Sequence, residues 1–174
     1  STASWTPRAA VAERPELALI QGLLCFEGGR VREPVELLGL ADVQAEALHY
    51  GGPMSRSGEE FHERLAARGA ALSVVAADDA LEIEFEARPE DLGWVLDAAA
   101  ELLRYPHYPP EVALLARERL IDRLEREADD PAAVADALLA ARVWGAGDVY
   151  ARRASCATAE RIDRDELVTF HRAH

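Results

Sequence analysis

The sequence predicts an α+β domain, in which an antiparallel sheet has helices packed on one of its faces. Residues 81–86 alternate between apolar and acidic side chains at every position, which is the period of a half-buried strand. Residues 71–76 form a second short apolar run, and helical patterns fill residues 89–144. Strands and helices in separate runs of the chain are typical of the α+β class.

The first predicted element covers residues 17–26, a mostly apolar run that ends at Gly28-Gly29. Its length suits a buried strand, although a short helix has the same apolar pattern. Cys25 lies inside this run, and we expect it to be a small core residue.

Two helices are predicted next. In residues 36–50 the apolar side chains recur at helical spacing, and Gly51-Gly52-Pro53 ends the pattern. Ser57 and Glu60 form a candidate capping box, in which the Ser57 hydroxyl accepts from a free backbone amide and Glu60 reaches back. The helix that they begin stops at Gly69.

A hairpin follows, because Asp78-Asp79 separates the two strand-like runs at residues 71–76 and 81–86. One face of this antiparallel pair is expected to be wet. The side chains predicted to face the core are Leu81, Ile83 and Phe85, and those predicted to face solvent are Glu82, Glu84 and Glu86.

The remainder of the chain is predicted to be helical. Helices are expected at residues 89–104, 111–128 and 131–144, and Asp163 is positioned to cap a last one. Residues 1–15, with two prolines, are interpreted as an irregular lead-in, and residues 16–174 as a single domain.

Composition excludes several classes of protein. With 32 acidic and 19 basic residues among 174, the net charge is −13. A nucleic-acid binder needs a basic surface, and so does a protein that binds an anionic membrane. The sequence has neither a signal-peptide pattern nor an apolar run long enough to span a bilayer, so we expect a soluble chain of unassigned compartment.

Several short motifs occur in a fixed order along the chain. They are Gly28-Gly29 to Pro34, Gly39-Leu40-Ala41, Gly51, Arg56-Ser57, Pro89-Glu90-Asp91, Asp129-Asp130-Pro131 and Ile162-Asp163 to Phe170. In this order and spacing, the sequence resembles the first domain of the pitrilysin/insulinase-like zinc peptidases, the family that includes the mitochondrial processing peptidase.

The resemblance implies a site that has lost its catalytic groups. In active members the residues after Gly-Leu-Ala read H-x-x-E-H, where two His bind zinc and the Glu activates water. Here these positions hold Asp42, Ala45 and Glu46. The third zinc ligand of the family corresponds to a position near Asp122 or Arg123. We therefore predict no catalytic residue and no metal ligand in this chain, and zinc only in an active partner.

The resemblance also implies partners and a larger protein. In the family, an active and an inactive half close around an unfolded peptide, so the chain is expected to be a fragment of a two-domain protein. Its predicted partners are an active zinc peptidase subunit or domain and an unfolded peptide, in a homodimer or heterodimer. Two alternatives remain open: an interaction module without peptide handling, and an active metallopeptidase with an atypical carboxylate site at Asp42, Glu46 and an acid near Asp122.

Two Glu-x-x-His pairs offer a further metal-binding hypothesis. Glu46 precedes His49 by three residues, and Glu59 precedes His62 by the same spacing. This is the ligand spacing of di-metal carboxylate proteins, where two further helices each add a Glu. Surface or half-buried histidines are the alternative, and we prefer it because both pairs lie on consecutive short helices.

Overall fold

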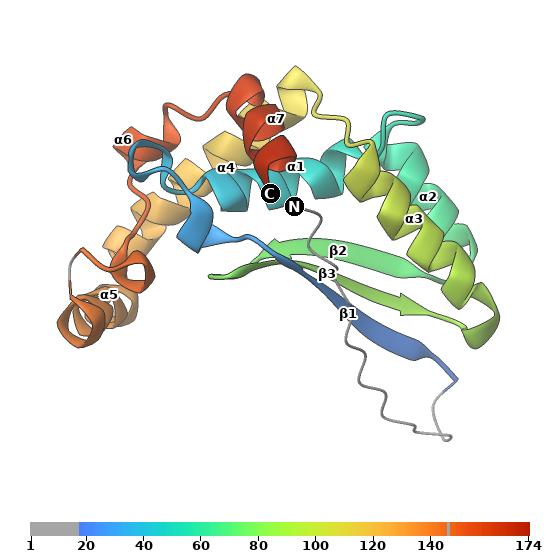
Figure 1. Cartoon of the computed structure of the whole chain (residues 1–174), viewed down its shortest axis with the longest axis horizontal. Helices are drawn as coiled ribbons and strands as arrows, with labels where there is room; N and C mark the ends of the chain where they lie inside the picture. Colours follow the sequence, from blue (N-terminus) through green and yellow to red (C-terminus); the bar gives the residue numbers. More distant parts are fainter. Residues whose placement is uncertain (1–17, 146) are drawn as a thin grey trace, which may run out of the picture.

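A computed structural model describes residues 18–145 and 147–174, and it confirms the predicted α+β class (Figure 1). The sheet contains β1 (Ile20–Glu27), β2 (Ala71–Ala76) and β3 (Ala80–Ala87) in the order β1-β3-β2, all antiparallel. The helices are α1 (Leu40–Gly51), α2 (Gly58–Ala67), α3 (Leu92–Arg104), α4 (Pro110–Ala128), α5 (Pro131–Trp144), α6 (Cys156–Ala159) and α7 (Arg164–Ala173). The predicted lead-in at residues 1–15 lies outside the described residues.

The helices gather on one side of the sheet, as predicted (Figure 1). The core lies between this side of the sheet and the helices α1, α2, α3 and α7. Its fully buried side chains include Leu48, Phe61, Ile83, Leu102 and Leu167. Because each of these comes from a different element, the core joins the sheet to all four helices.

The β2–β3 hairpin agrees with the sequence pattern. The amide of Ala77 donates to the carbonyl of Ala80 across the predicted two-residue turn, at 2.8 Å. Ile83 and Phe85 are buried and Leu81 is partly buried, whereas Glu84 is exposed. The alternation of apolar and acidic residues therefore did specify which face of β3 meets the core.

The expectation for Cys25 was wrong, because the Cys25 side chain is exposed. Strand β1 alternates strictly between more and less exposed positions, with Leu24 and Phe26 on the core side. In a strand, successive side chains point to opposite faces, so Leu23 and Cys25 face away from the helices. The sequence did not reveal which residues face outward, because the apolar run lacks a regular alternation with polar residues.

Helix α1 begins four residues later than residue 36, the predicted start. Val35–Leu37 forms a separate 3-10 turn, and Leu38 is extended. Gly39 then adopts a positive φ of 101°, which ends the preceding segment. A Cβ atom at Gly39 would lie 2.6 Å from Cδ2 of Leu120 on α4, so both the backbone and the packing require glycine here.

The predicted helix boundaries are otherwise close, with two local exceptions. Ser57 caps α2 by accepting from the amide of Glu60 at 3.2 Å, but the Glu60 carboxylate pairs with Arg64 instead of completing a capping box. Helix α6 was not predicted. It is a single turn, begun by Ser155, and too short to show a helical period.

Candidate functional site

The positions that the sequence resemblance assigns to a degenerate zinc motif lie where α1 meets α4. Asp42 and Glu46 are one turn apart on α1, and each contacts an arginine of α4. The Glu46 carboxylate lies 2.8 Å from Arg119, and the Asp42 carboxylate lies 3.3 Å from Arg123. Residues 42 and 46 and residues 119 and 123 thus form matching i, i+4 pairs on two helices that run in opposite directions.

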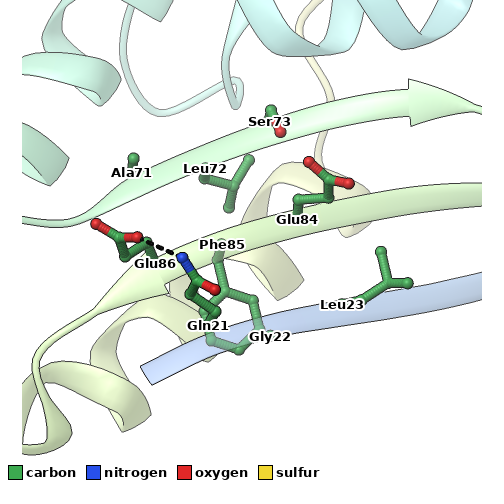
Figure 2. A pocket seen from close by; sticks show the side chains of 9 residues that line it. All are labelled: Gln21, Gly22, Leu23, Ala71, Leu72, Ser73, Glu84, Phe85 and Glu86. Carbon is green, nitrogen blue, oxygen red and sulfur yellow. Dashed lines mark hydrogen bonds between the residues drawn. The ribbon is translucent and has the colours of Figure 1, made fainter. Parts of the chain in front are cut away.

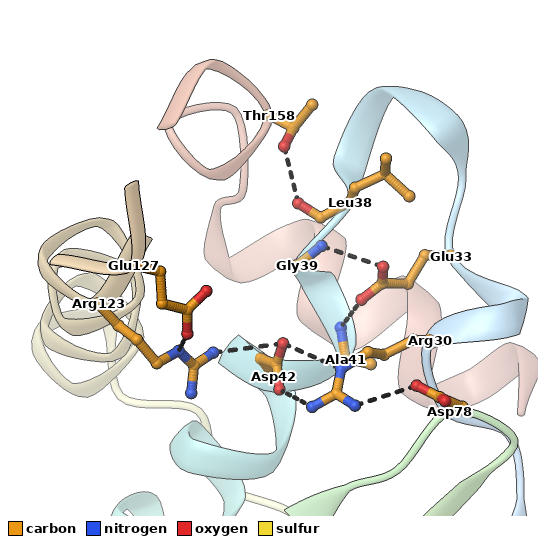
Figure 3. A network of polar contacts seen from close by, with 10 residues as sticks. All are labelled: Arg30, Glu33, Leu38, Gly39, Ala41, Asp42, Asp78, Arg123, Glu127 and Thr158. Atoms are coloured by element: carbon orange, nitrogen blue, oxygen red, sulfur yellow. Dashed lines mark hydrogen bonds and ion pairs between the residues drawn. The ribbon is translucent and has the colours of Figure 1, made fainter. Parts of the chain in front are cut away.

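Asp42 also binds a second arginine, which comes from the loop after β1 (Figure 3). Arg30 makes a bidentate contact with Asp42, at 2.8 Å and 3.3 Å, and lies 3.2 Å from Asp78 in the β2–β3 turn. The hydrogen bonds that Arg30 donates to Asp42 raise the pKa of Arg30 above its already high usual value. The network therefore joins α1, α4, the hairpin and the loop after β1.

The side chains of Asp42 and Glu46 are largely buried by this contact. As residues of a solvated helix surface they would be well exposed, but their side chains are only 16% and 26% exposed. Ala45, between them, is buried and has no group that can bind a metal or a proton. The sequence did not reveal these ion pairs because Glu46 and Arg119 are 73 positions apart, and Asp42 and Arg123 are 81 positions apart.

The residues at the motif positions do not fit a catalytic zinc ion. Such an ion needs about three ligands with free lone pairs and one open position. Here both available carboxylates are engaged by guanidinium groups, and the facing side chains of α4 are cations. Within residues 18–145 and 147–174, no three His, Cys, Asp or Glu side chains are placed to hold a metal ion.

Of the two candidates for the third ligand position, only Arg123 contacts the motif. Its guanidinium reaches Asp42 and also lies near Glu127, whereas the neighbouring Asp122 is exposed. The atypical carboxylate site would need an acid of α4 beside Asp42 and Glu46, and the side chain that reaches Asp42 from this stretch is basic.

Glu33 fixes the start of α1 beside this network. Its carboxylate accepts from the amides of Gly39 and Ala41 at 3.0 Å and 2.7 Å, and so replaces the side-chain cap that Gly39 lacks (Figure 3). Burial raises the pKa of Glu33 to about 7, although the two amides oppose this shift. Thr158 of α6 donates to the carbonyl of Leu38 at 2.9 Å and holds the same segment from the other side.

The two Glu-x-x-His pairs do not form a common site. His62 contacts the carbonyl of His49 through Nε2 at 2.7 Å, and the two rings lie 4.5 Å apart. Burial, together with the neighbouring His62, lowers the pKa of His49 to about 4. Glu46, the acid of the first pair, is bound by Arg119. The half-buried interpretation fits this geometry better than a metal site.

The outer face of the sheet is acidic along its middle strand. Glu82, Glu84 and Glu86 of β3 lie between uncharged residues of β1 and β2, and the three strands contain no Lys, Arg or His. A depression of about 530 Å³ opens near the start of β1 (Figure 2). On the core side of the sheet the Phe85 ring covers Gly22, and on the outer side Gln21 donates to Glu86 at 2.9 Å.

Strand β2 is an edge of the described sheet. The hydrogen bond from Ala77 to Ala80 makes these two residues a hydrogen-bonded pair. Hydrogen-bonded and non-hydrogen-bonded pairs alternate along two antiparallel strands, so the register shows which residues of β2 bond to β3. It follows that Leu72, Val74 and Ala76 direct their backbone N–H and C=O groups away from β3. An extended chain can add to such an edge through main-chain hydrogen bonds.

Helix α5 is apolar on its exposed side. Every residue of α5 is at least partly exposed, although its only charged residues are Asp136 and Arg142. Leu138, Leu139 and Val143 are 67%, 61% and 63% exposed. The helix lies at the end of the molecule, away from the sheet (Figure 1). Contiguous exposed apolar surface of this kind marks protein interaction sites.

The structure is an α+β domain, and the positions that the sequence resemblance assigns to a zinc-binding motif hold Asp42, Ala45 and Glu46. No protein-family model matches the sequence, and no curated protein matches it. Comparison of structures is informative. The peptidase M16 inactive domain from Pseudomonas fluorescens superposes with a TM-score of 0.77 over 90% of this chain, at 20% identity.

Two further solved structures share the fold. A protease from Helicobacter pylori matches with a TM-score of 0.75 at 15% identity over 89% of this chain. The periplasmic protease PqqL from Escherichia coli matches with a TM-score of 0.71 at 11% identity over 90% of it. The chain therefore shares the fold of these peptidase-family structures, and the fold implied by the sequence resemblance is confirmed.

The matched region is only part of each neighbour. This chain covers 38% of the Pseudomonas and Helicobacter proteins and 17% of PqqL. The predicted domain limits, 1–15 and 16–174, stay a prediction. No described helix is both long and apolar enough to cross a membrane.

Proposed function

We propose that this chain is a non-catalytic domain of a peptidase of the M16 fold, which forms part of a peptide-binding chamber and pairs with a zinc-bearing half. The observation that carries the proposal is the set of ion pairs at the motif positions. Asp42 and Glu46 bind arginines in place of a metal ion, and Ala45 cannot act as a general base. Positioning of a peptide, without cleavage, is the role left to such a domain.

Metal content of the wild-type chain tests the proposal first. The chain is incubated with zinc, washed, and analysed for metal and for peptidase activity. We expect well below one zinc per chain and no cleavage, because no free ligand set faces the motif. About one zinc per chain, retained after washing, would favour the atypical carboxylate site and overturn the proposal.

Pairing is proposed to use the apolar side of α5. In the Pseudomonas protein the matched region is 38% of the chain, so this fold is accompanied there by further protein. The occupant that we propose is a zinc-bearing half with an intact H-x-x-E-H motif. Its contact with Leu138, Leu139 and Val143 would cover the large apolar surface that α5 now exposes.

Leu139→Glu tests this pairing. When co-expressed with an H-x-x-E-H-bearing subunit of the same fold from the same genome, the wild-type chain is expected to co-purify with it. Leu139→Glu should reduce recovery by about tenfold or more, because a buried charge disfavours an apolar interface. Leu114→Glu, at an exposed leucine of α4, is the matched control. Equal recovery of all three proteins would reject α5 as the pairing surface.

Peptide binding is proposed to use the free edge of β2, beside the acidic outer face of the sheet. Val74→Pro removes an N–H group that faces the edge but not one that holds β3. The matched control is Val74→Ala, which loses the same buried side chain and keeps the N–H group. We expect an unfolded basic peptide, followed by fluorescence anisotropy, to bind Val74→Pro about tenfold more weakly than Val74→Ala.

The same measurement separates the proposal from its main alternative. An interaction module without peptide handling would expose the apolar side of α5 equally well, and pairing alone does not distinguish the two functions. If the wild-type chain, paired with its zinc-bearing half, binds no unfolded peptide, the interaction module becomes the better description.

A further inference from the structure

The position that the sequence resemblance assigns to a metal ion lies here beside three cationic side chains. Arg119 and Arg123 approach from α4 and Arg30 from the loop after β1. The acids that they contact, Asp42 and Glu46, stand at the two positions where active members carry histidines. The arrangement of charges is therefore that of a metal centre, because the groups on α1 are anionic and the groups that they contact are cationic.

We infer that the guanidinium groups of Arg119 and Arg123 take the place of the metal ion, so that the cation of this site is a fixed part of the chain. The inference rests on the proposed function for the equivalence of Asp42 and Glu46 with the two metal-binding positions. It goes further, because a domain can lose its ligands without gaining an internal cation.

The ion pairs connect the same elements that a metal ion would connect. In the family the zinc ligands come from the motif helix and from the later helix, which correspond to α1 and α4. Here Glu46–Arg119 and Asp42–Arg123 join α1 to α4 at 2.8 Å and 3.3 Å. Arg119 also lies over the Tyr50 ring, 4.9 Å from its centroid, which fixes the position of its guanidinium.

The inference explains why the carboxylates are tolerated in a part-buried contact between helices. Asp42 and Glu46 would repel each other one turn apart on α1, and partial burial would increase that repulsion. The arginines at the same spacing on α4 neutralise both. The charge pattern of the two helices is thus complementary only in the folded chain.

Rescue by a metal ion tests the inference directly. In the Arg119→Ala/Arg123→Ala variant the two carboxylates lose their α4 partners, and the thermal midpoint Tm should fall by about 4 °C. Millimolar zinc or manganese should then raise the Tm of this variant by several degrees, because a divalent cation can join the two carboxylates. The wild-type chain and the control variant Arg126→Ala should not respond to the metals.

A second variant addresses the metal site itself. Asp42→His, Ala45→Glu and Glu46→His restore the motif, and Arg119→Ala with Arg123→Glu removes the internal cation and adds a third ligand. By calorimetry, the five-substitution variant should bind one zinc at least about 100-fold more tightly than the variant with the three motif substitutions alone. The three-substitution variant keeps both guanidinium groups of α4, whereas the five-substitution variant keeps only that of Arg30 beside the metal position.

The outcomes separate this inference from the proposed function. Zinc bound tightly by the wild-type chain would overturn the proposed function and the inference together. A metal-free wild type whose double variant gains no Tm from metal would overturn the inference alone. Equal zinc affinity of the three- and five-substitution variants would also overturn it, because the arginines would then be no obstacle to the metal.

Discussion

Substitution of Glu33 by Ala is expected to lower the free energy of unfolding by about 3 kcal/mol, because two backbone amides at the buried start of α1 lose their acceptor. Gly39 has no side chain that could replace this cap. Glu33→Gln is the matched control. It keeps one carbonyl acceptor and should cost less than half as much. Urea denaturation of the three proteins measures the difference.

The contribution of Glu33 to the free energy of unfolding should decrease as the pH rises. The folded chain holds its proton until about pH 7, because burial raises the pKa of Glu33, whereas the unfolded chain releases it near pH 4.5. Between these values the folded state binds more protons, so the stability contributed by Glu33 falls as pH rises. Relative to Glu33→Gln, the wild type should lose about 2 kcal/mol between pH 5 and pH 8. A difference that stays constant or grows with pH would contradict this prediction.

The contact between Gly39 and Leu120 is expected to produce the second large effect. Gly39→Ala should cost about 2–3 kcal/mol, since an alanine at a positive φ is strained and its methyl group meets Leu120 Cδ2. Leu120→Ala should cost about 3 kcal/mol by leaving a cavity between α1 and α4. In the double variant the smaller side chain leaves room for the new methyl group.

A double-mutant cycle distinguishes packing from backbone strain at this contact. We expect the two costs to be non-additive by about 1 kcal/mol, with the double variant more stable than their sum predicts. Strict additivity would mean that the positive φ alone accounts for the requirement for glycine. Either result bears on the site, because Leu120 lies between the two arginines of α4 along the chain and helps to set their distance from α1.

The sequence predicted the fold well where its local pattern was complete. The alternation in residues 81–86 specified the strand and its buried face, and the Ser57 and Asp163 caps marked the starts of α2 and α7. The prediction failed where the pattern was ambiguous. The apolar run around Cys25 has no polar alternation, and the short 3-10 turn at Val35–Leu37 mimics a helix start.

Part of the candidate site was also visible in the sequence. The substitution of Asp42, Ala45 and Glu46 at the motif positions is a property of the chain alone, and it is sufficient to predict that the usual zinc site is missing. Asp42 and Glu46 are four residues apart, a spacing that puts two side chains on one face of a helix, and both contact α4.

Only the tertiary structure decided what replaces the metal. Arg119 and Arg123 are two of several arginines in α4, and nothing local connects them to Glu46 and Asp42, which lie 73 and 81 positions earlier. Their pairing with Asp42 and Glu46 depends on the antiparallel crossing of α4 on α1, which is set by the core contacts of Leu120 and by the space that Gly39 leaves. Charge complementarity between distant segments exists only after packing has brought them together, and for that reason the sequence determined the loss of the zinc ligands while the fold determined the internal cation.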